Sequence, residues 1–581
     1  ALGRTLARWT GQSRVLVDLE GHGREEIVGG VDLSRTVGWF TTIFPLALDL
    51  AADDWGATLK AVKEQLRVVP TRGLGYGALR WLRQGNAQAD ALAQGPAPQV
   101  SFNYLGQFDW ASDADHSALR PVDGGLGGDE SPLAPRTHLL DIVGAVQDGE
   151  LELVWSYSEG LHDHATIERL AGEMTLALTE IIAHCAEEDA GGRTPSDFPL
   201  ARLDQATVDV LAGDGRGVED IYPLTPMQAG MVFHGLSQAD QGVYLEQATF
   251  VVEGVSDPTL LAQAFQQVVD RTPILRSRIV WEGVAEPLQV VHRQVALPVV
   301  HLDWSGLSEP GQDEALERLL DADRAQGLAL DTAPLARLAL ARLSQDEVQV
   351  LWTFHHALLD GWSVFHVLSD VFACHATLAG DPTALPARRP FRDYLAWLAR
   401  QDQAQAQAHW QGVLAGFESP TALPYDRAPV QAHTTQSSQW LPFELDEVDS
   451  RRLLGFAKAH RLTMNTLVQG AWALLLSRYS GQSDVCFGTT VSGRPADLPG
   501  VDAMTGIFIN TVPVRADLDG AAPVASWLQA LQAAQAESRR FDFVSLAQMQ
   551  TWAGLPGGVN LFDSIVVFEN YPINDQAAAE H

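Results

Sequence analysis

The sequence predicts a layered α/β protein with more than one lobe, and three observations support this. Strand-like and amphipathic helical segments alternate, the chain has 581 residues, and one block of motifs occurs twice. Such alternation is typical of helices packed on sheets, and a domain usually takes about 100–200 residues. Hydrophobic residues make up 46% of the chain and charged residues 19%, which is ordinary for globular cores. We therefore expect several α/β lobes.

The charge and the cysteines exclude several classes of partner. The formal net charge is −34, so the surface repels nucleic acid and gives no reason to expect an anionic membrane. No apolar run is long enough to span a bilayer, and the first residues do not show a basic segment followed by an apolar one. The cysteines, Cys185, Cys374 and Cys486, are far apart and lack metal-ligand spacing. We expect a cytoplasmic protein without disulfides, and without nucleic acid or membrane as a partner.

An internal repeat relates the two ends of the chain. ARWTGQSRVLVDLEGHGR and SRYSGQSDVCFGTTVSGR share Gly-Gln-Ser and a terminal Gly-Arg. Two further segments follow in the same order in each copy. The matched pairs are 7–24 with 477–494, 36–50 with 504–518, and 99–106 with 564–572. The chain therefore contains two related lobes.

The repeat also gives the expected organisation. After the third match the first copy continues with a predicted strand at 151–157 and a helix at 165–185, whereas the second copy has few residues left. We expect the second copy to lack its last strand and helix, and the chain to be truncated at both ends. A segment rich in glycine and proline separates the copies. The predicted parts are a lobe at 1–186, a linker at 187–217, and two lobes at 218–390 and 391–581.

The middle of the chain shows the alternation most clearly. Strands are predicted at 244–252 and 347–355, and helices at 258–270 and 362–379. The alanine- and glutamine-rich run at 401–411 predicts a helix with a solvated face.

The segment His355-His356-Ala-Leu-Leu-Asp360-Gly361-Trp-Ser carries the strongest chemical signal. It lies between a predicted strand and a predicted helix. A neutral imidazole, with a pKa near ~6.5, can accept a proton at cytoplasmic pH. Adjacent strand residues point to opposite faces, so one histidine can face a cavity while the other packs. Asp360 could pair with an arginine and fix the loop.

Two other interpretations of this segment stay open. A histidine pair is often only part of a core or of a surface. A metal site formed by His355, His356 and Asp360 lacks a further ligand at suitable spacing, so we predict no metal.

HHALLDGWS resembles the HHxxxDG signature of nonribosomal peptide synthetase condensation domains and their acyltransferase relatives. Other motifs of that family occur in order over about 218–581. They lie at 222–234, 270–278, 391–397, 506–515 and 561–572. The resemblance implies two chloramphenicol-acetyltransferase-like lobes in a V, with carrier-bound substrates entering a central tunnel from opposite faces.

The resemblance also implies roles for residues. The acceptor's α-amine would attack the donor thioester, and His356 would act as general base or as a positioning group. His355, Asp360 and Gly361 would shape the loop, with Asp360 paired to Arg276. Phosphopantetheine would arrive on partner carrier domains rather than be bound directly, and an adenylation domain would belong to the same assembly line. The opening YPLTPMQAGMVFH resembles domains that take a D-configured donor and an L-configured acceptor.

The first lobe resembles part of an epimerization domain. The motifs that carry this resemblance lie at 18–25, 34–46, 70–77 and 100–109. In the repeat Glu20 aligns with Thr490 and His22 with Ser492, so this copy has ionisable groups where the other has hydroxyls. The resemblance implies that Glu20 exchanges a Cα proton, with His22 as a further candidate. No HHxxxDG loop precedes Glu20, so we expect an incomplete site; a solvated loop of Glu20, His22 and Arg24 is the alternative.

Two other functions remain open for the whole chain. One is an acyltransferase that uses a soluble coenzyme A thioester, against which the epimerase-like copy argues. The other is a non-catalytic docking platform, against which the intact HHALLDG segment argues.

Overall fold

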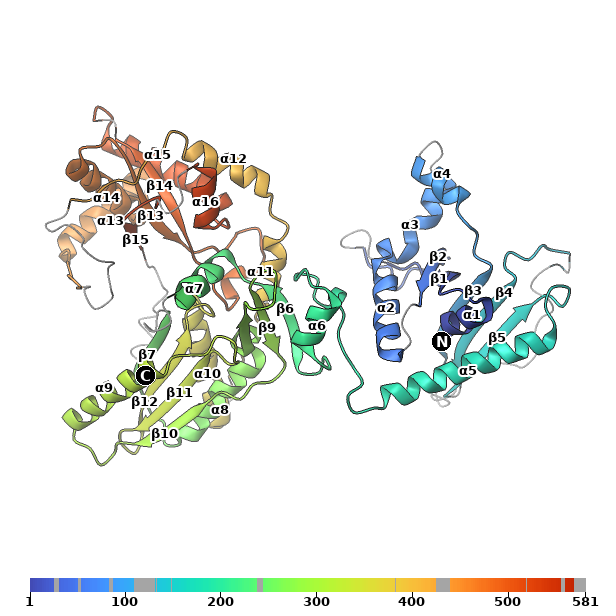
Figure 1. Ribbon diagram of the computed structural model, residues 1–581. Coiled ribbons are helices and arrows are strands. Elements are labelled where there is room, and N and C mark those ends of the chain that lie inside the picture. Colours follow the sequence, from blue (N-terminus) through green and yellow to red (C-terminus); the bar gives the residue numbers. More distant parts are fainter. Residues whose placement is uncertain are drawn as a thin grey trace. The chain divides into compact units, whose positions relative to one another are not determined.

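The computed structural model shows two compact units, Ala1–Gly217 and Val218–His581 (Figure 1). The described residues are 1–25, 31–50, 54–82, 87–108, 131, 133–147, 149–237, 244–381, 383–424, 439–518, 520–554 and 560–568.

A five-stranded sheet of order β2-β1-β3-β4-β5 forms the centre of the first unit. Helices α1 and α5 pack on it through an apolar core that includes Leu6, Val17, Ile142 and Leu170. These residues alternate along the strands and recur at helical spacing along α1 and α5, which is why the segments fold as they do. The elements are α1 (Leu2–Thr10), β1 (Arg14–Gly21), β2 (Thr42–Asp49), α2 (Trp55–Val68), α3 (Leu74–Gly77), α4 (Ala87–Gln94), β3 (Val100–Phe108), β4 (Leu140–Gln147), β5 (Glu150–Tyr157), α5 (His164–Cys185) and α6 (Gln205–Ala212).

The segment 187–217 is an ordered part of the first unit. Its Asp197 forms ion pairs with Lys63 at 2.5 Å and with Arg67 at 2.8 Å, both on α2. Burial opposes ionisation of Asp197, but the hydrogen bonds from Lys63, the Thr194 amide and Arg67 lower its pKa to about 2. Lys60 of α2 pairs with Asp209 of α6 at 2.6 Å. The segment is therefore held on α2 by charge and by hydrogen bonds.

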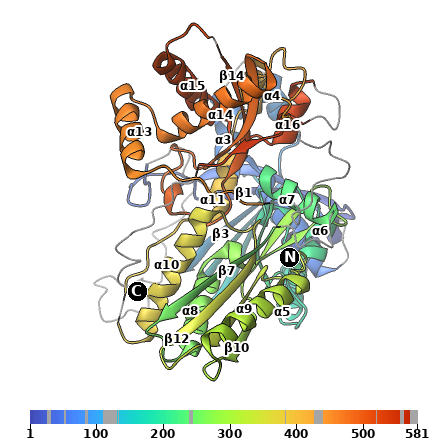
Figure 2. The same cartoon turned by 90° about the vertical axis from the view of Figure 1, so that its left-hand side faces the viewer.

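The first lobe of the second unit is built on a four-stranded sheet of order β10-β11-β12-β7. Helices α8 and α10 lie beside this sheet (Figure 2). On one face Phe265 of α8 contacts Trp352, and Phe372 of α10 contacts Phe250. On the other face α9 is joined to the sheet by the hydrogen bond from Thr353 to Asp323. The elements are β6 (Val218–Pro223), α7 (Pro226–Ser237), β7 (Leu245–Glu253), α8 (Pro258–Arg271), β8 (Ser277–Val280), β9 (Leu288–His292), β10 (Val299–Asp303), α9 (Glu309–Gln326), β11 (Ala336–Arg342), β12 (Glu347–His355) and α10 (Gly361–Leu378).

The second lobe has a three-stranded sheet of order β14-β13-β15, on which α14 and α15 pack. Its core includes Ala473, Phe487, Val514 and Leu531. The elements are α11 (Phe391–Leu398), α12 (Gln403–Val413), α13 (Glu447–His460), α14 (Met464–Ser480), β13 (Asp484–Val491), β14 (Asn510–Asp517), α15 (Val524–Ser538), α16 (Leu546–Trp552) and β15 (Ile565–Val566).

The predicted strands and helices of the middle region agree with the structure to within one or two residues. The solvated helix predicted at 401–411 is only half correct. Helix α12 buries Ala406 and Trp410 completely, and the Trp410 indole donates a hydrogen bond to the carbonyl of Phe541 at 3.0 Å. The sequence did not predict this contact, because alanine and glutamine dominate the segment and one tryptophan makes most of the buried face.

The internal repeat is also a repeat of structure. Strands β1 and β2 pair antiparallel with Arg14 opposite Asp49, and β13 and β14 pair in the same way with Asp484 opposite Asp517. In each copy a parallel strand, β3 or β15, lies on the other side of the first strand.

One turn in each copy requires glycine. Gly23 and Gly493 follow the first repeat strand with φ values of +66° and +59°. A Cβ atom would lie 1.6 Å from the carbonyl oxygen of Phe40 at the first position and 1.7 Å from that of Phe508 at the second. Both backbone conformation and space therefore exclude a side chain.

We expect Gly493→Ala to destabilise the second unit far more than Gly481→Ala. Both glycines have positive φ, which costs an L residue about 1–2 kcal/mol, but only at Gly493 does the new methyl group also overlap a carbonyl. Urea denaturation of both variants measures the difference. Equal losses in the free energy of unfolding would show that the turn can move away.

Candidate active site

The histidine loop joins β12 to α10. His355 ends the strand and is 5% exposed, and its Nδ1 accepts a hydrogen bond from the Ala357 amide at 3.1 Å. Burial, together with the neighbouring His356, lowers the pKa of His355 to about 4. His355 is therefore a neutral packing residue at physiological pH.

His356 faces a cavity and has a defined tautomer. Its backbone amide donates to the Tyr244 carbonyl, and its Nδ1 lies 2.8 Å from the carbonyl oxygen of Leu359. A carbonyl oxygen can only accept, so Nδ1 carries the proton of the neutral ring. The lone pair of Nε2 is then available, and no residue that the structure describes bonds to it.

Asp360 fastens this loop to the second lobe. It caps α10, which begins at Gly361, by accepting from the Ser363 amide at 2.8 Å. It also accepts from the Phe508 amide at 3.1 Å and forms an ion pair with Arg494 at 3.2 Å. The two charged side chains are 2% and 6% exposed, so this is a buried ion pair.

The predicted pairing of Asp360 with Arg276 is wrong. Arg276 ends the short helix Pro273–Arg276, forms an ion pair with Glu219 at 2.8 Å, and donates to the carbonyls of His292 and Arg293. Its guanidinium therefore joins segments of the first lobe. The repeat pointed to the actual partner of Asp360, because the first block ends in Gly-Arg in both copies and Arg494 is the arginine of the second copy.

A second set of hydrogen bonds reinforces the contact between the lobes. The Ser363 hydroxyl donates to the Gly506 carbonyl at 2.7 Å and accepts from the Gly506 amide at 3.0 Å. The Asp360 amide also donates to the Gly506 carbonyl. A Cβ atom on Gly506 would lie 2.2 Å from the Phe391 ring, so glycine is needed for this approach.

The cavity beside His356 has a volume of about 1370 Å³. Ordinary small-molecule sites occupy about 300–1,000 Å³, so this cavity has room for more than one substrate group. Its walls come from the histidine loop, from α12 and from the strands β13 and β14, and also from residues 537–543. The sequence indicated the loop but neither α12 nor residues 537–543 as cavity walls.

The first unit places Glu20 and His22 at one end of β1. The Glu20 carboxylate is exposed and accepts a hydrogen bond from the Asn103 amide group at 2.7 Å. The His22 side chain is 62% exposed and lies 3.4 Å from Glu25. Glu20 is thus held on a strand, and His22 is mostly in solvent. Their counterparts in the second copy, Thr490 and Ser492, line the large cavity.

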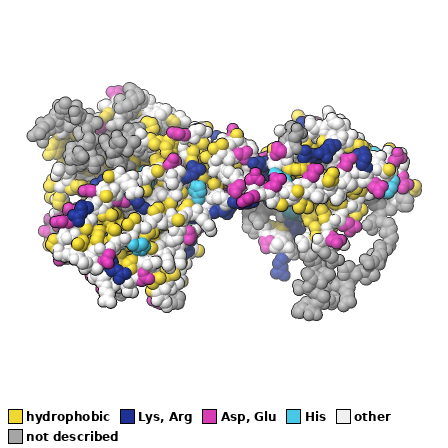
Figure 3. Space-filling view, turned by 60° about the horizontal axis from the view of Figure 1, so that its bottom comes forward, with side chains coloured by type: hydrophobic (Ala, Val, Ile, Leu, Met, Phe, Trp, Pro, Cys, Tyr) yellow, Lys and Arg dark blue, Asp and Glu magenta, His cyan; other side chains and the backbone are white. Residues whose placement is uncertain are grey.

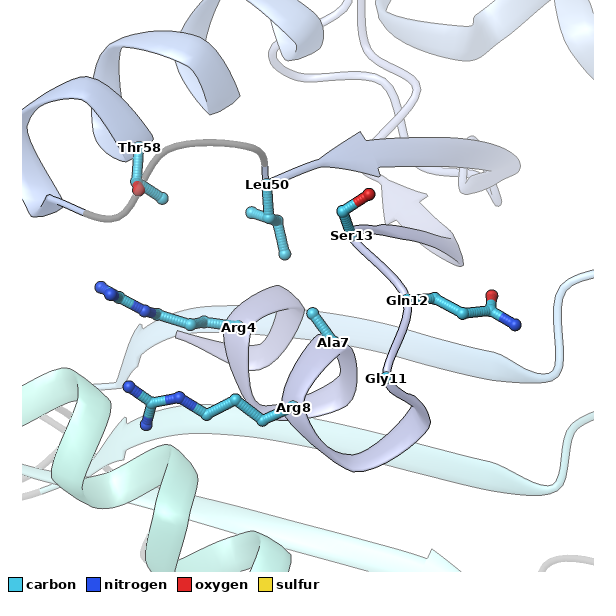
Figure 4. Close-up of a pocket in the computed structure, with 8 residues that line it drawn as sticks. All are labelled: Arg4, Ala7, Arg8, Gly11, Gln12, Ser13, Leu50 and Thr58. Carbon is cyan, nitrogen blue, oxygen red and sulfur yellow. The ribbon is translucent and has the colours of Figure 1, made fainter.

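A smaller hollow of about 410 Å³ lies in the first unit (Figure 4). Figure 4 shows Arg4 and Arg8 extending in the same direction from α1, with Thr58 of α2 nearby. The Arg4 guanidinium stacks on Trp55 at 4.4 Å. No candidate catalytic residue lines this hollow.

Acidic and basic side chains are spread over the face of the molecule seen in Figure 3. Across the described ranges, no group of three histidine, cysteine or carboxylate side chains could hold a metal ion. None of the helices in those ranges is both long and apolar enough to cross a bilayer. Cys185, Cys374 and Cys486 are free thiols.

We expect Asp360→Asn to lower the free energy of unfolding by about 3–5 kcal/mol, because Arg494 would stay buried without its counter-charge. Asp484→Asn is the matched control, since Asp484 is 46% exposed in its ion pair with Arg515 and should contribute below about 1 kcal/mol. Chemical denaturation measures both. Similar losses would contradict the assignment of Asp360 as the buried connection.

Comparison with known proteins places the chain in a family. A family model described as "Condensation domain" matches residues 1–203 and 218–581. Two proteins of the linear gramicidin synthase of Brevibacillus parabrevis are also similar to this chain. One is 45% identical over 589 residues, covering 100% of this chain and 8% of that protein. The other is 44% identical over 573 residues, covering 98% and 11%. The chain thus spans about a tenth of the length of these curated relatives.

The solved structures agree in fold. The X-domain from teicoplanin biosynthesis has a TM-score of 0.51 and 25% identity, covering 59% of this chain and 76% of that one. The two matched stretches coincide closely with the two compact units. The chain belongs to the condensation-domain family of nonribosomal peptide synthetases.

Proposed function

We propose that the second unit joins a carrier-bound donor to a carrier-bound aminoacyl acceptor, the peptide-bond-forming reaction of condensation domains. The observation that carries this proposal is His356, whose Nε2 lone pair is available beside a cavity of about 1370 Å³. The acceptor amine attacks the donor thioester carbonyl, and Nε2 takes a proton from the attacking nitrogen. The C–N bond forms as the C–S bond breaks, and the proton passes to the leaving thiolate.

The cavity contributes by holding both reactants. Two groups fixed in a reactive geometry behave as if at very high concentration, which can remove about 7–11 kcal/mol of the barrier. The Leu359 carbonyl keeps the imidazole in one tautomer, and the Asp360–Arg494 ion pair holds the loop in place. His356 thus acts from a prearranged position.

The partners follow from this chemistry. The leaving thiol belongs to the phosphopantetheine arm of the donor carrier domain, and a second carrier domain presents the acceptor. An adenylation domain of the same assembly line loads the carriers. The donor ends in a D residue and the acceptor is an L residue, which the opening motif at 222–234 supports.

The first unit is the second lobe of an epimerization domain in this proposal, and Glu20 is one of its acid–base groups. Arg24 supports the lobe assignment. Its Nη1 donates to the carbonyls of Leu33 and Thr36, as Arg494 Nη1 does to the equivalent Val501 and Met504. The ring of Phe40 lies 4.4 Å from Arg24, and Phe508 lies 4.0 Å from Arg494.

The exposed surface beside Arg24 supports the same assignment. Val37 is 100% exposed and Trp39 is 91% exposed, whereas their counterparts Thr505 and Ile507 are 5% and 1% exposed. In the second unit those counterparts lie beside Gly506, which bonds to the histidine loop. We infer that a lobe with a similar loop covers Val37 and Trp39, and that its aspartate pairs with Arg24.

Transfer between carriers tests the function of the second unit. Donor carriers ending in a D or an L residue are mixed with an L-aminoacyl acceptor carrier, and intact-protein mass spectrometry follows the donor. We expect transfer of the D-ended donor only. Transfer of both would remove the stereochemical assignment, transfer from a coenzyme A thioester alone would indicate an acyltransferase, and no transfer would favour a docking platform.

In the same assay His356→Ala should lower turnover by ~10²-fold or more, because the base is lost. His375→Ala is the matched control, since His375 lies on α10 and does not line the cavity. Circular dichroism checks that both variants fold. Unchanged turnover in His356→Ala would exclude the general-base role.

Glu20→Gln should abolish Cα proton exchange in the protein as its source cells produce it, because an amide cannot accept the proton. Deuterium uptake at the Cα of the carrier-bound residue in heavy water measures exchange. Glu25→Gln is the control, since Glu25 contacts His22 and Arg72 rather than Asn103. Normal exchange in Glu20→Gln would remove Glu20 from the mechanism.

A further inference from the structure

A carboxyl group in the cavity wall, that of Asp542, has no role in the mechanism above. Asp542 follows α15 and the turn Arg539–Phe541. Its backbone is fixed, because the Asn510 amide group donates to the carbonyls of Asp542 at 2.6 Å and Val544 at 2.7 Å. The same cavity is lined by His356 and Asp542. Asp542 is therefore a fixed position in the wall of this cavity.

The other acidic side chains of the cavity wall are mostly engaged or exposed. Asp360 pairs with Arg494, Asp497 accepts from the Trp397 indole at 3.2 Å, and Glu537 pairs with Arg540 at 2.8 Å. Asp402 caps α12, and Asp502 is exposed. In the described part of the chain, no other residue donates a hydrogen bond to the Asp542 carboxylate.

The surroundings of Asp542 favour its protonated form. Burial raises the pKa of Asp542 to about 7, and the charge of Arg539 only partly opposes this. Asp542 in turn contributes to the raised pKa of buried Tyr394. Arg539 and Tyr394 interact with its charge, and the titratable groups Arg540, Glu537 and His409 line the same cavity. Its own backbone amide is the donor to this carboxylate, and it does not offset the burial. A partly buried carboxyl without a partner on another residue is unfavourable for stability, so it calls for an explanation from function.

Amide formation requires the removal of two protons from the acceptor. An α-amino group has a pKa of about 7.7–8.0, so most of it arrives as an ammonium ion that cannot attack. One proton must leave before attack and the other during attack. His356 can accept only one of them, because its Nδ1 already carries a proton bonded to the Leu359 carbonyl.

Resting on the proposed function, we propose that Asp542 binds the acceptor's α-ammonium group and takes its first proton. The N–H bond breaks toward the carboxylate, which becomes a neutral carboxylic acid, and the nitrogen gains its lone pair. The amine then attacks the thioester, and His356 takes the second proton and passes it to the thiolate. Asp542 returns to the carboxylate by releasing its proton to water. A group that titrates near the working pH suits such a transfer.

The test is the pH dependence of Asp542→Asn in the carrier-transfer assay. With an amine pKa near ~8, about a tenth of the acceptor is neutral at pH 7, so the variant should be ~10-fold slower there. At about pH 9 the amine is already neutral, so the variant should approach the wild-type rate. Glu447→Gln is the control and should follow the wild type, because Glu447 is 84% exposed in its ion pair with Arg451 and does not line the cavity. An acceptor with an α-hydroxyl group should show no dependence on Asp542.

Thermal melting separates this role from a structural one. The folded-state pKa of Asp542 lies above its ordinary value of 3.8, so stability present below that value is lost as pH rises to about 7. Asp542→Asn removes that loss and should melt higher than the wild type above neutral pH. A lower melting temperature with a rate deficit independent of pH would overturn the proposal.

The remaining outcomes separate this inference from the proposed function. If the wild-type chain transfers the donor and Asp542→Asn has the same rate at every pH, only the role of Asp542 is overturned. Absence of transfer by the wild type with every donor and acceptor would overturn the proposed function and this role together.

Discussion

The ion pair between Asp360 and Arg494 is the contact on which the geometry of the histidine loop depends. Both side chains are buried, and taking two charges out of water is unfavourable unless every hydrogen-bonding position is used. Burial lowers the pKa of Arg494, which Asp360 opposes, and both side chains also bond to backbone groups, while Arg494 donates to the Ser363 hydroxyl. The loop that carries His356 is thereby attached to both lobes, so the relative placement of the two lobes also determines the position of His356.

Hydrophobic spacing in the sequence predicted the helices and strands. The site was predicted less well, because it depends on contacts between residues far apart in the chain. The strand that ends at His355 and the helix after Asp360 follow from hydrophobic spacing, which neighbours in sequence determine. The partner of Asp360 could not be predicted in this way, because Arg494 lies far along the chain and the nearer Arg276 serves Glu219. Asp542 gave no signal either, since its environment comes from desolvation by several elements.

The two copies of the repeat form the same glycine–arginine turn in two different surroundings. Gly23 and Gly493 make the same turn, and the arginine after each glycine is held by the same two carbonyl positions. Arg494 meets a carboxylate, whereas no described carboxylate pairs with Arg24. The turn is therefore formed by contacts within its own segment, and it does not need the opposite lobe to shape it.

In helix α12 different side chains stabilise the fold and line the cavity. Ala406 and Trp410 fix the helix from one side, while Gln405 and His409 line the cavity from the other. Gln405 is exposed, so its substitution leaves the anchoring residues untouched, whereas His409 contacts the Trp410 ring and bonds to Ser538. The shape of the cavity can thus change through an exposed side chain of one helix, without compensating changes in the core.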